Sequence, residues 1–340
     1  MEFSEPVFSA WLRAELGGDG PLSVRTLQSS AGIANALYLV DWCERTMVMR
    51  TPPLERITAS QGNIDREARL LAALADTDVR HPRLVASCRD ASVIGSPLVL
   101  MERIDGFNPI DPLPAHLVDD PVFRRGLGLE IVDALADLSL VDWRAAGLEG
   151  FGKPDGFLAR QVDRWSWQLD SYRFRPLADA DLVAEWLRSN LPPAGPIGIL
   201  HGDYSLFNVM FNDASPAELA AIIDWDTATI GEPLMDLGHL LARWDEPDEA
   251  PSSLGSADIA DRSGFVTRAE LTDRYARRTG WDVSNIRYYE VVSLFKLGCI
   301  MEGHHAHELQ TPSAVGTGPR FTESAPNLFR DALRIMRGER

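Results

Sequence analysis

The chain has 340 residues, enough for one large domain or for two lobes that share a cleft. Apolar residues make up 45% and charged residues 24%, and no apolar run approaches the roughly 18 residues that would span a bilayer. The net charge of −17 at pH 7 argues against a nucleic-acid partner, which would require a basic face. Composition therefore favours an ordinary globular protein with no membrane or nucleic-acid partner.

The start of the chain and the cysteines indicate a cytoplasmic protein. The first residues, MEFSEPVFSAWLRAEL, include acidic residues early and no basic segment, unlike a secretory signal. Cys43, Cys88 and Cys299 are odd in number and far apart, so neither a disulfide framework nor a zinc site is expected. We therefore expect three free thiols and a location in the cytoplasm.

The first hundred residues are predicted to be rich in strands. The runs Ile33 to Trp42 and Thr46 to Arg50 flank a short polar stretch, 43–45, which indicates a hairpin. Ser96 to Met101 is a further predicted strand. Between them, Ile64 to Ala75 is predicted to be a helix because its apolar residues recur at helical spacing.

Helices are predicted to dominate after Gly106. The segment Pro121 to Val141 has one apolar stripe and a proline near its start, both typical of a helix. Further helices are predicted at Phe157 to Asp170, Asp181 to Asn190, Leu271 to Arg278 and Asn285 to Gly303. The chain thus divides into a strand-rich N-terminal lobe, residues 1–104, and a helix-rich C-terminal lobe, residues 105–340, an α+β arrangement.

The segment 197–238, IGILHGDYSLFNVMFNDASPAELAAIIDWDTATIGEPLMDLG, contains a predicted hairpin with polar residues in apolar strands. Its strands, Phe207 to Phe211 and Leu219 to Trp225, follow a strand that ends before Asp203. With the turn centred near Pro216, Asn208 and Asp224 are predicted to lie directly opposite each other. An amide oxygen and a carboxylate that face each other across a hairpin form a site suited to Mg²⁺.

The spacing His-x-Asp-x-x-x-x-Asn, from His201 to Asn208, matches a kinase catalytic loop. In that arrangement Asp203 accepts the proton of the acceptor hydroxyl and Asp224 binds the metal. We expect His201 to fix the loop by hydrogen bonds, and Asp236 to cap the next helix or brace the loop. Each polar residue alone could be a turn cap, but three at this spacing favour phosphoryl transfer.

HGDYSLFNVMF followed by IIDWDTATIGEPLMDLG resembles the aminoglycoside phosphotransferase-like superfamily of small-molecule kinases. The resemblance extends from about Ser23 to the C-terminal helices. It implies a protein-kinase-like fold of two lobes, ATP or GTP as the phosphoryl donor, and Mg²⁺ as the cofactor. MERIDGF at 101–107 and FGKPDGFLARQVDRW at 151–165 are similar to a branch related to the kinase-like domain of acyl-CoA dehydrogenase family members 10 and 11.

On the nucleotide side, Arg50 ends a predicted strand at the position where kinases have a lysine. Glu67 lies on the apolar face of its predicted helix, and a carboxylate there needs a cation, for which Arg50 is the obvious partner. An arginine is usual here in the branch that the chain resembles. A purely structural Arg50–Glu67 pair is the alternative.

Two further segments are expected to contact the nucleotide. The loop 29–35 has a single glycine, Gly32, and could offer backbone N–H groups and the Ser29 and Ser30 hydroxyls to phosphate oxygens. The fold resemblance implies that Glu102 to Ile104, where the two lobes join, present backbone groups to the nucleobase.

On the acceptor side, Lys153, Arg160 and Arg164 form a basic cluster that could bind an anionic substrate such as a carboxylate or a CoA-linked compound. A solvated helix face is the alternative. The histidines of GHHAHE, at 303–308, lack the i, i+4 pair of helical zinc sites and are expected to be surface or packing residues.

Three functions remain open from the sequence. The first is a kinase of a small hydroxylated molecule, with a hydroxyacyl compound or an aminoglycoside as examples of the acceptor. The second is a nucleotide-binding pseudokinase with a regulatory or interaction role, which Arg50 keeps open. The third is a metal-dependent hydrolase that uses the same carboxylates.

Overall fold

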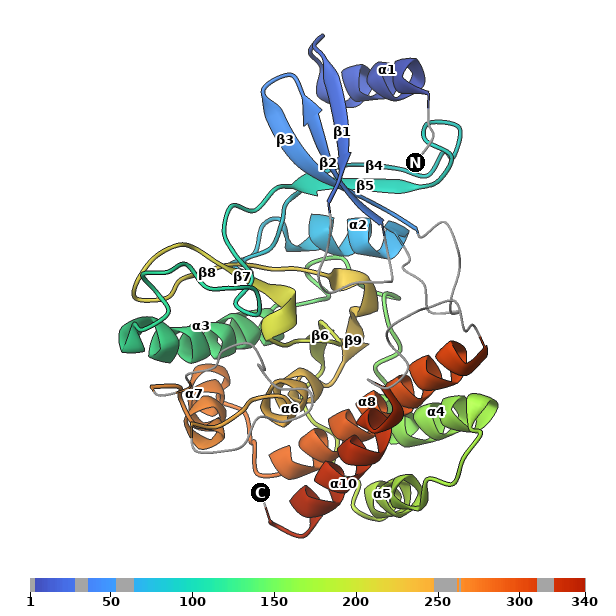
Figure 1. Ribbon diagram of the computed structural model, residues 1–340, viewed down its shortest axis with the longest axis vertical. Helices are drawn as coiled ribbons and strands as arrows, with labels where there is room; N and C mark the ends of the chain where they lie inside the picture. Colours follow the sequence, from blue (N-terminus) through green and yellow to red (C-terminus); the bar gives the residue numbers. More distant parts are fainter. Residues whose placement is uncertain are drawn as a thin grey trace.

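The computed structural model describes residues 4–27, 36–52, 64–247, 262, 264–310 and 321–339. Within these ranges the chain forms two lobes, with a sheet and two helices placed above a larger, mainly helical body (Figure 1). The expected α+β architecture of a sheet-containing N-terminal lobe and a helical C-terminal lobe is confirmed.

The N-terminal sheet has five strands in the order β1-β2-β3-β5-β4, and neighbouring strands run antiparallel. The strands are β1 (Leu22–Thr26), β2 (Ala36–Trp42), β3 (Arg45–Thr51), β4 (Leu84–Cys88) and β5 (Leu98–Glu102). The predicted hairpin is confirmed as β2 and β3, in which Trp42 lies opposite Arg45. The strand predicted at 96–101 is β5.

One helix packs against each face of the sheet. Because side chains alternate along a strand, neighbouring residues of β3 face different helices. Met47 and Met49 of β3 share an apolar cluster with α1 (Glu5–Leu16). Val48 and Arg50 have the opposite parity, and Arg50 reaches α2 (Ile64–Leu74) on the other face. The alternation of β3 therefore directs the Arg50 guanidinium to the side where the second lobe begins.

The C-terminal lobe contains the five helices whose ranges the sequence predicts, with ends shifted by up to seven residues. They are α3 (Pro121–Ser139), α4 (Phe157–Tyr172), α5 (Ala178–Ser189), α7 (Arg268–Thr279) and α8 (Ile286–Gln310). The described residues also form α6 (Leu234–Ala242) and α10 (Ser324–Met336), for which no range is predicted from the sequence. Helix α3 begins at Pro121, and the Asp120 side chain caps the helix by accepting from Val122 N and Phe123 N. Among the described residues, no helix combines the length and apolar character needed to cross a bilayer.

Helix α8 lies in the centre of this lobe and packs against α4, α5, α6 and α10 (Figure 1). Glycines permit two of these contacts. A Cβ at Gly238 of α6 would collide with the backbone of Tyr289, and one at Gly298 of α8 would meet the ring of Phe329. These close crossings fix α6 and α10 against α8.

Two small antiparallel pairs lie between the sheet and the helices. Strand β6 (Gly198–Leu200) pairs with β9 (Thr229–Gly231), and β7 (Val209–Phe211) pairs with β8 (Leu219–Ile222). The single-turn helices η1 (Leu206–Asn208) and η2 (Trp225–Thr227) adjoin the second pair. Asn208 ends η1 and Asp236 lies on α6, whereas His201, Asp203 and Asp224 lie in the short connections beside these elements.

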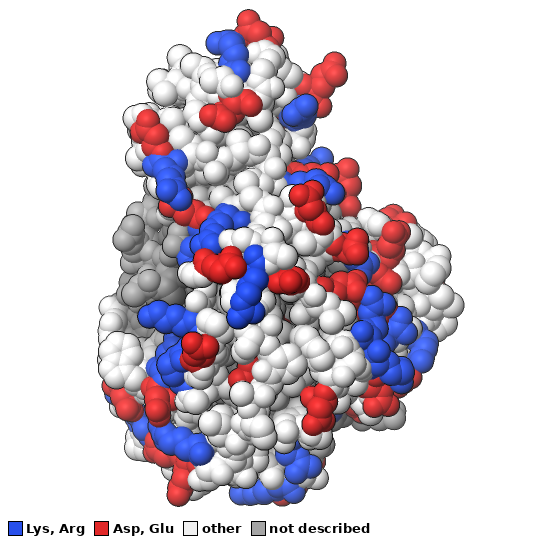
Figure 2. Space-filling model, turned by 180° about the vertical axis from the view of Figure 1, so that it is seen from behind, with Lys and Arg blue, Asp and Glu red and all other residues white. Residues whose placement is uncertain are grey.

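Surface arginines are frequently paired with carboxylates. On the face shown in Figure 2, acidic and basic side chains are interspersed. One example of such pairing is the two-pronged contact of Arg274 with Asp133, at 2.6 Å for both N–O distances.

A buried ion pair fixes α8 to the connection between α4 and α5. The Glu302 carboxylate, which is fully buried, accepts from Arg175 Nε at 2.8 Å and from Arg175 Nη2 at 2.6 Å. Arg175 also donates to the backbone oxygen of Thr322 at 2.8 Å. The guanidinium thus joins three segments of the lobe.

We predict that Arg175→Met lowers the free energy of unfolding by about 3–5 kcal/mol, because Glu302 then stays buried without a cation. The measurement is urea denaturation at pH 7. Arg173→Met is the matched control, since it removes a pair with Asp181, whose side chain is 65% exposed, and should cost less than about 1 kcal/mol. Equal losses in the two variants would contradict the prediction.

Candidate active site

The loop 201–203 is held in place by Asp236, a buried residue of α6. The Asp236 carboxylate accepts from His201 N at 2.6 Å and from Gly202 N at 2.9 Å. His201 is itself buried, and its Nε2 lies 2.8 Å from the backbone oxygen of Ile223. The expectations that His201 fixes the loop and that Asp236 braces it are confirmed.

Gly202 allows the loop to turn sharply. Its φ of +88° lies in the region that favours glycine, and a Cβ there would lie 2.7 Å from the backbone oxygen of Thr227. The turn presents Asp203 at the end of β6.

Asp203 lies among hydrogen-bond donors and cations. Its Oδ2 accepts from Asn208 Nδ2 at 3.0 Å, while His239 Nε2 lies 2.9 Å and Arg243 Nη1 3.6 Å from Oδ1. Burial alone would raise the pKa of Asp203, but the contact with His239 and the charges of Arg243 and Lys296 hold it well below its usual range. Asp203 is therefore ionised at neutral pH.

His239 is neutral in this environment. Burial lowers its pKa from 6.5 to about 4, against the opposing effect of Asp203. A neutral imidazole can still donate one N–H, so its contact with Asp203 needs no positive charge.

Sequence reasoning missed His239 and Arg243, although a signal was present. Asp236, His239 and Arg243 have the spacing i, i+3 and i+7, which places them along one face of a helix. In the structure, Asp236 contacts the backbone of the loop and the other two contact Asp203. One face of α6 thus supports the loop and its carboxylate.

Lys296 of α8 was also missed. Its Nζ donates to the backbone oxygen of Gly202 and lies 5.9 Å from the ring centroid of Trp165. Lys296 is remote from the loop in sequence, and no local pattern links the two, so only the packing of α8 reveals the contact.

The predicted opposition of Asn208 and Asp224 is wrong by one residue. The pairing runs from Val209 opposite Ile222, and the N–H of Ile223 bonds the backbone oxygen of Asn208 at 2.9 Å. Asp224 follows with φ +65° and ψ +66°, so the chain leaves the strand at that residue. The prediction failed because it assumed a regular strand through Asp224, yet both residues do lie at the same end of the hairpin.

Arg50 joins carboxylates from both lobes. Its Nη1 lies 2.7 Å from Glu67 Oε1, and its Nη2 lies 2.5 Å from Asp224 Oδ1 and 3.6 Å from Asp226 Oδ2. Burial disfavours the charged guanidinium, but Glu67 and Asp224 outweigh burial and raise the pKa of Arg50. The predicted Arg50–Glu67 pair is present, and the contact with Asp224 extends it across the lobe boundary.

Asp226 is a further carboxylate that sequence reasoning did not single out. It is the second Asp of the IDWD stretch, with a side chain that is 12% exposed. Burial and the nearby charge of Asp224 raise its pKa to about 7. Asp224 and Asp226 thus place two carboxyl groups beside Arg50.

The donor set fits a divalent cation. Asn208 uses its amide nitrogen for both bonds to Asp203, at 2.8 Å to the backbone oxygen and 3.0 Å to Oδ2, so the amide oxygen is the atom that can bind a cation. The Asp224 side chain is 40% exposed and forms an ion pair with Arg50. A bound metal ion would take the place of Arg50 as the cation beside this carboxylate. An amide oxygen and carboxylates are the ligands that Mg²⁺ prefers, completed by water and phosphate oxygens.

Of the other residues predicted to contact the nucleotide, the structure describes only Glu102, Arg103 and Ile104. Glu102 ends β5, and its N–H is donated to the backbone oxygen of Arg83 at 2.9 Å. Ile104 is half-buried just beyond it. Ser29, Ser30 and Gly32 lie outside the described residues.

The predicted basic cluster is only partly assembled. Arg160 donates to the backbone oxygens of Asp155 and Lys153, so its guanidinium closes the turn before α4. Arg164 stacks over the ring of Trp165, with its guanidinium carbon 5.1 Å from the centroid, on the ring that Lys296 also approaches. The structure therefore brings Arg164 toward Lys296 and gives Arg160 a structural contact.

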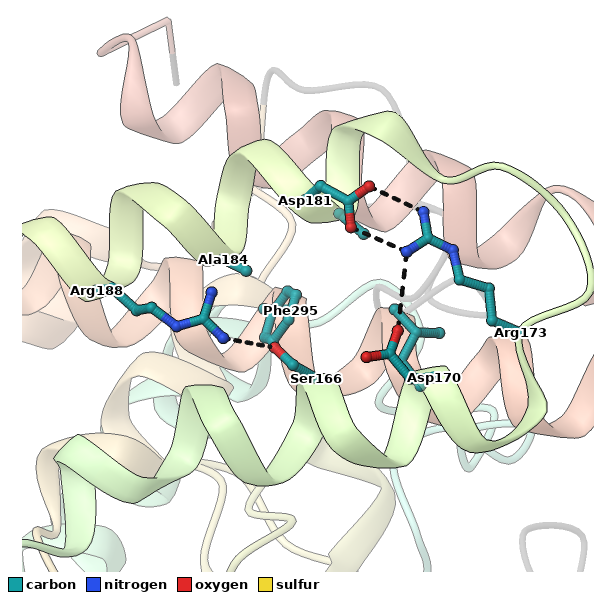
Figure 3. Close-up of a pocket in the computed structure, with 9 residues that line it drawn as sticks. Ser166, Asp170, Arg173, Asp181, Ala184, Arg188 and Phe295 are labelled. Atoms are coloured by element: carbon teal, nitrogen blue, oxygen red, sulfur yellow. Dashed lines mark hydrogen bonds and ion pairs between the residues drawn. The ribbon is translucent and has the colours of Figure 1, made fainter.

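A cavity of about 180 Å³ lies apart from these residues, between α4 and α5 with Phe295 of α8 at its base (Figure 3). Arg173 pairs with Asp181, and Arg188 bonds Ser166. None of the residues predicted for the site lines this pocket. Among the described residues, no group of three or more His, Cys, Asp and Glu side chains is placed to hold a metal ion.

The fold and site together define a kinase-like phosphotransferase, with an Asp–Asn loop and a second Asp at the boundary of two lobes. The chain belongs to the phosphotransferase enzyme family, whose sequence profile matches residues 26–282.

Two comparisons extend over nearly the whole chain. A solved structure, a putative aminoglycoside phosphotransferase from Ralstonia eutropha JMP134, is 29% identical, with a TM-score of 0.81 over 98% of this chain and 99% of that one. Acyl-CoA dehydrogenase family member 10 of Mus musculus is 27% identical over 97% of this chain but only 31% of its own length. The chain thus spans about a third of that relative.

A more distant structure shows the same fold. The GDP complex of aminoglycoside 2'-phosphotransferase-IIIa is 17% identical, with a TM-score of 0.64 over 96% of this chain and 98% of that one. The predicted likeness to aminoglycoside phosphotransferases and to the acyl-CoA dehydrogenase 10 and 11 branch is confirmed.

The low pKa of His239 predicts a pH dependence of stability. Its folded-state pKa of about 4 lies below the value of 6.5 expected when unfolded, so the unfolded chain binds the proton more readily between these values. Stability from this residue is complete above pH 6.5 and falls as the pH is lowered toward 4. Between pH 7 and 5, the loss from His239 should be on the order of 2 kcal/mol.

The measurement is urea denaturation of the native protein and of His239→Gln at pH 7 and pH 5. The native protein should lose about 2 kcal/mol more than the variant between the two pH values, because glutamine does not titrate. Parallel losses in both proteins would contradict a neutral, buried His239.

Proposed function

We propose that the chain transfers the terminal phosphate of a Mg²⁺-bound nucleoside triphosphate, ATP or GTP, to a hydroxyl group of a small molecule. The observation that carries the proposal is the contact of Asp203 with Asn208 beside a lobe boundary where Arg50 holds Asp224. This set supplies an orienting carboxylate, a metal site and a phosphate-binding cation, the parts that phosphoryl transfer requires.

The proposed chemistry assigns one role to each residue of the loop. The acceptor oxygen attacks the terminal phosphorus, the bond to the β-phosphate oxygen breaks, and the acceptor proton passes to Asp203. A low pKa suits an orienting group, because the loose transition state needs little proton removal at the start. Asn208 and Asp224 would hold Mg²⁺, which neutralises charge on the phosphates when bound.

Arg50 is the proposed cation for the α- and β-phosphates. Its guanidinium is already oriented by Glu67, whose side chain is only 1% exposed, and can bind phosphate oxygens in place of Asp224.

We assign nucleotide binding to the N-terminal lobe, residues 1–104, including Ser29, Ser30, Gly32 and the chain near Glu102 and Ile104. Residues 105–340 would supply catalysis and acceptor binding. The triphosphate donor implies a cytoplasmic location.

For the acceptor, we favour an anionic hydroxylated compound, such as a hydroxyacyl compound, over an aminoglycoside. The surroundings of Asp203 contain Arg243 and Lys296, and Arg164 lies nearby. Such cations would repel a polycation and attract a carboxylate or a phosphate. The names of the acyl-CoA dehydrogenase relatives support the same choice. Lys153 and Arg160 would lie further from Asp203 in the proposed acceptor-binding region.

We predict that Asp203→Asn lowers Mg²⁺-dependent turnover of ATP or GTP by about 10²–10⁴-fold, with nucleotide affinity retained. The measurement is phosphoryl transfer to a panel of hydroxyacyl compounds and other alcohols. Asp273→Asn, an exposed change on α7, is the matched control and should leave turnover unchanged. Tight nucleotide binding with no transfer by the native protein would favour the pseudokinase, and phosphate release at full rate without an acceptor would favour the hydrolase.

A second prediction separates a nucleotide-binding role of Arg50 from a structural one. The double variant Arg50→Met, Glu67→Met removes both partners of the buried pair, so neither is left without the other. We expect it to fold and to bind Mg²⁺-nucleotide at least about tenfold more weakly, whereas Arg50→Lys should retain more of the affinity. Calorimetry measures both, and unchanged affinity in the double variant would assign Arg50 to structure alone.

A further inference from the structure

Lysine is nearly absent from this chain. Of the 33 lysine and arginine residues, only Lys153 and Lys296 are lysines. Lys296 lies in α8, the central helix of the C-terminal lobe, and its Nζ donates to the backbone oxygen of Gly202, the residue before Asp203. A protein that uses arginine almost everywhere thus has a lysine beside the candidate catalytic carboxylate.

The loop itself supplies no positive charge. Its residues from Asp203 to Asn208 are DYSLFN, which contain no lysine, arginine or histidine. In phosphoryl transfer the negative charge spreads over three oxygens of the phosphoryl group, and cations near them stabilise the transition state. On the nucleotide side Arg50 can fill this role, and it is held there by Glu67 and Asp224.

Two other basic side chains, His239 and Arg243, lie near Asp203. Burial lowers the pKa of His239 to about 4, so its ring carries no charge at neutral pH. Arg243 lies 3.6 Å from Asp203 Oδ1, and its guanidinium carbon lies 4.5 Å from the ring centroid of Phe207. Lys296 has three N–H donors on a flexible stem, of which one is donated to Gly202.

We propose that Lys296 is a catalytic residue whose ammonium contacts the transferred phosphoryl group from the acceptor side. The inference rests on the proposed function and adds a group to it. During transfer, the bond from phosphorus to the β-phosphate oxygen breaks, the bond to the acceptor oxygen forms, and the acceptor proton goes to Asp203. Lys296 keeps its proton throughout and binds an oxygen of the phosphoryl group in flight.

Two features of the site suit this role. The bond to Gly202 places the ammonium at the turn that presents Asp203, so the cation and the carboxylate are positioned by the same backbone. Burial lowers the pKa of Lys296, and the carboxylates of Asp203 and Asp236 oppose that shift and so favour the ammonium form. A poorly hydrated cation binds an anion more strongly than one in water.

The test compares affinity for Mg²⁺–ADP with affinity for Mg²⁺–ADP–aluminium fluoride, which imitates the phosphoryl group in transfer and requires no acceptor. GDP replaces ADP if it binds more tightly. Lys296→Met should weaken the aluminium fluoride complex by about 10²-fold and change Mg²⁺–ADP affinity by less than about threefold. Lys296→Arg should recover part of the loss. Arg287→Met, an exposed change on the same helix, is the matched control and should alter neither affinity.

A spectroscopic measurement checks the contact directly. Since the chain has two lysines, ¹⁵N labelling of lysine gives two side-chain ammonium signals, assigned with Lys153→Arg. The Lys296 signal should shift on formation of the aluminium fluoride complex and shift much less with Mg²⁺–ADP alone.

The outcomes separate the two claims. Equal weakening of both complexes by Lys296→Met, or no weakening of either, would assign Lys296 to bracing Gly202 and overturn this inference while the proposed function stands. A native protein that binds neither nucleotide complex would overturn the proposed function, and this inference with it.

Discussion

The Arg50 guanidinium connects carboxylates that come from opposite lobes. It lies on the face of β3 that meets α2, where Glu67 is buried, and it extends to Asp224 at the end of the C-terminal hairpin. Because the cation is buried, loss of either carboxylate would be costly, so the pair positions the helix, the strand and the hairpin together. The proposed nucleotide site is thus organised around one buried charge.

A second set of buried polar groups orders the loop that presents Asp203. Asp236 of α6 holds the backbone of this loop, and Lys296 of α8 bonds the same turn. Helices α6 and α8 cross closely at Gly238, so a displacement of either helix would move the loop. The site therefore depends on the packing of the helical lobe as much as on its own sequence.

The sequence predicted the features that depend on local pattern. Short stretches of sequence predicted the apolar stripe of α3, the β2–β3 hairpin and the HGD…N loop. The position of Glu67 on an apolar helix face implied a buried cation as its partner, and that cation is Arg50. The contacts of Asp203 with His239 and Arg243 could have been found from the helical spacing after Asp236. The left-handed backbone of Asp224 and the approach of Lys296 depend on packing between distant segments, which periodicity does not encode.

The most direct test is a crystal structure with Mg²⁺ and a non-hydrolysable ATP or GTP analogue. We predict a metal ion bound by Asn208 and Asp224, the terminal phosphate facing Asp203, and Arg50 moved from Asp224 to the phosphates. A nucleotide bound elsewhere, for example in the cavity between α4 and α5, or a metal ion remote from Asn208 and Asp224, would contradict this prediction.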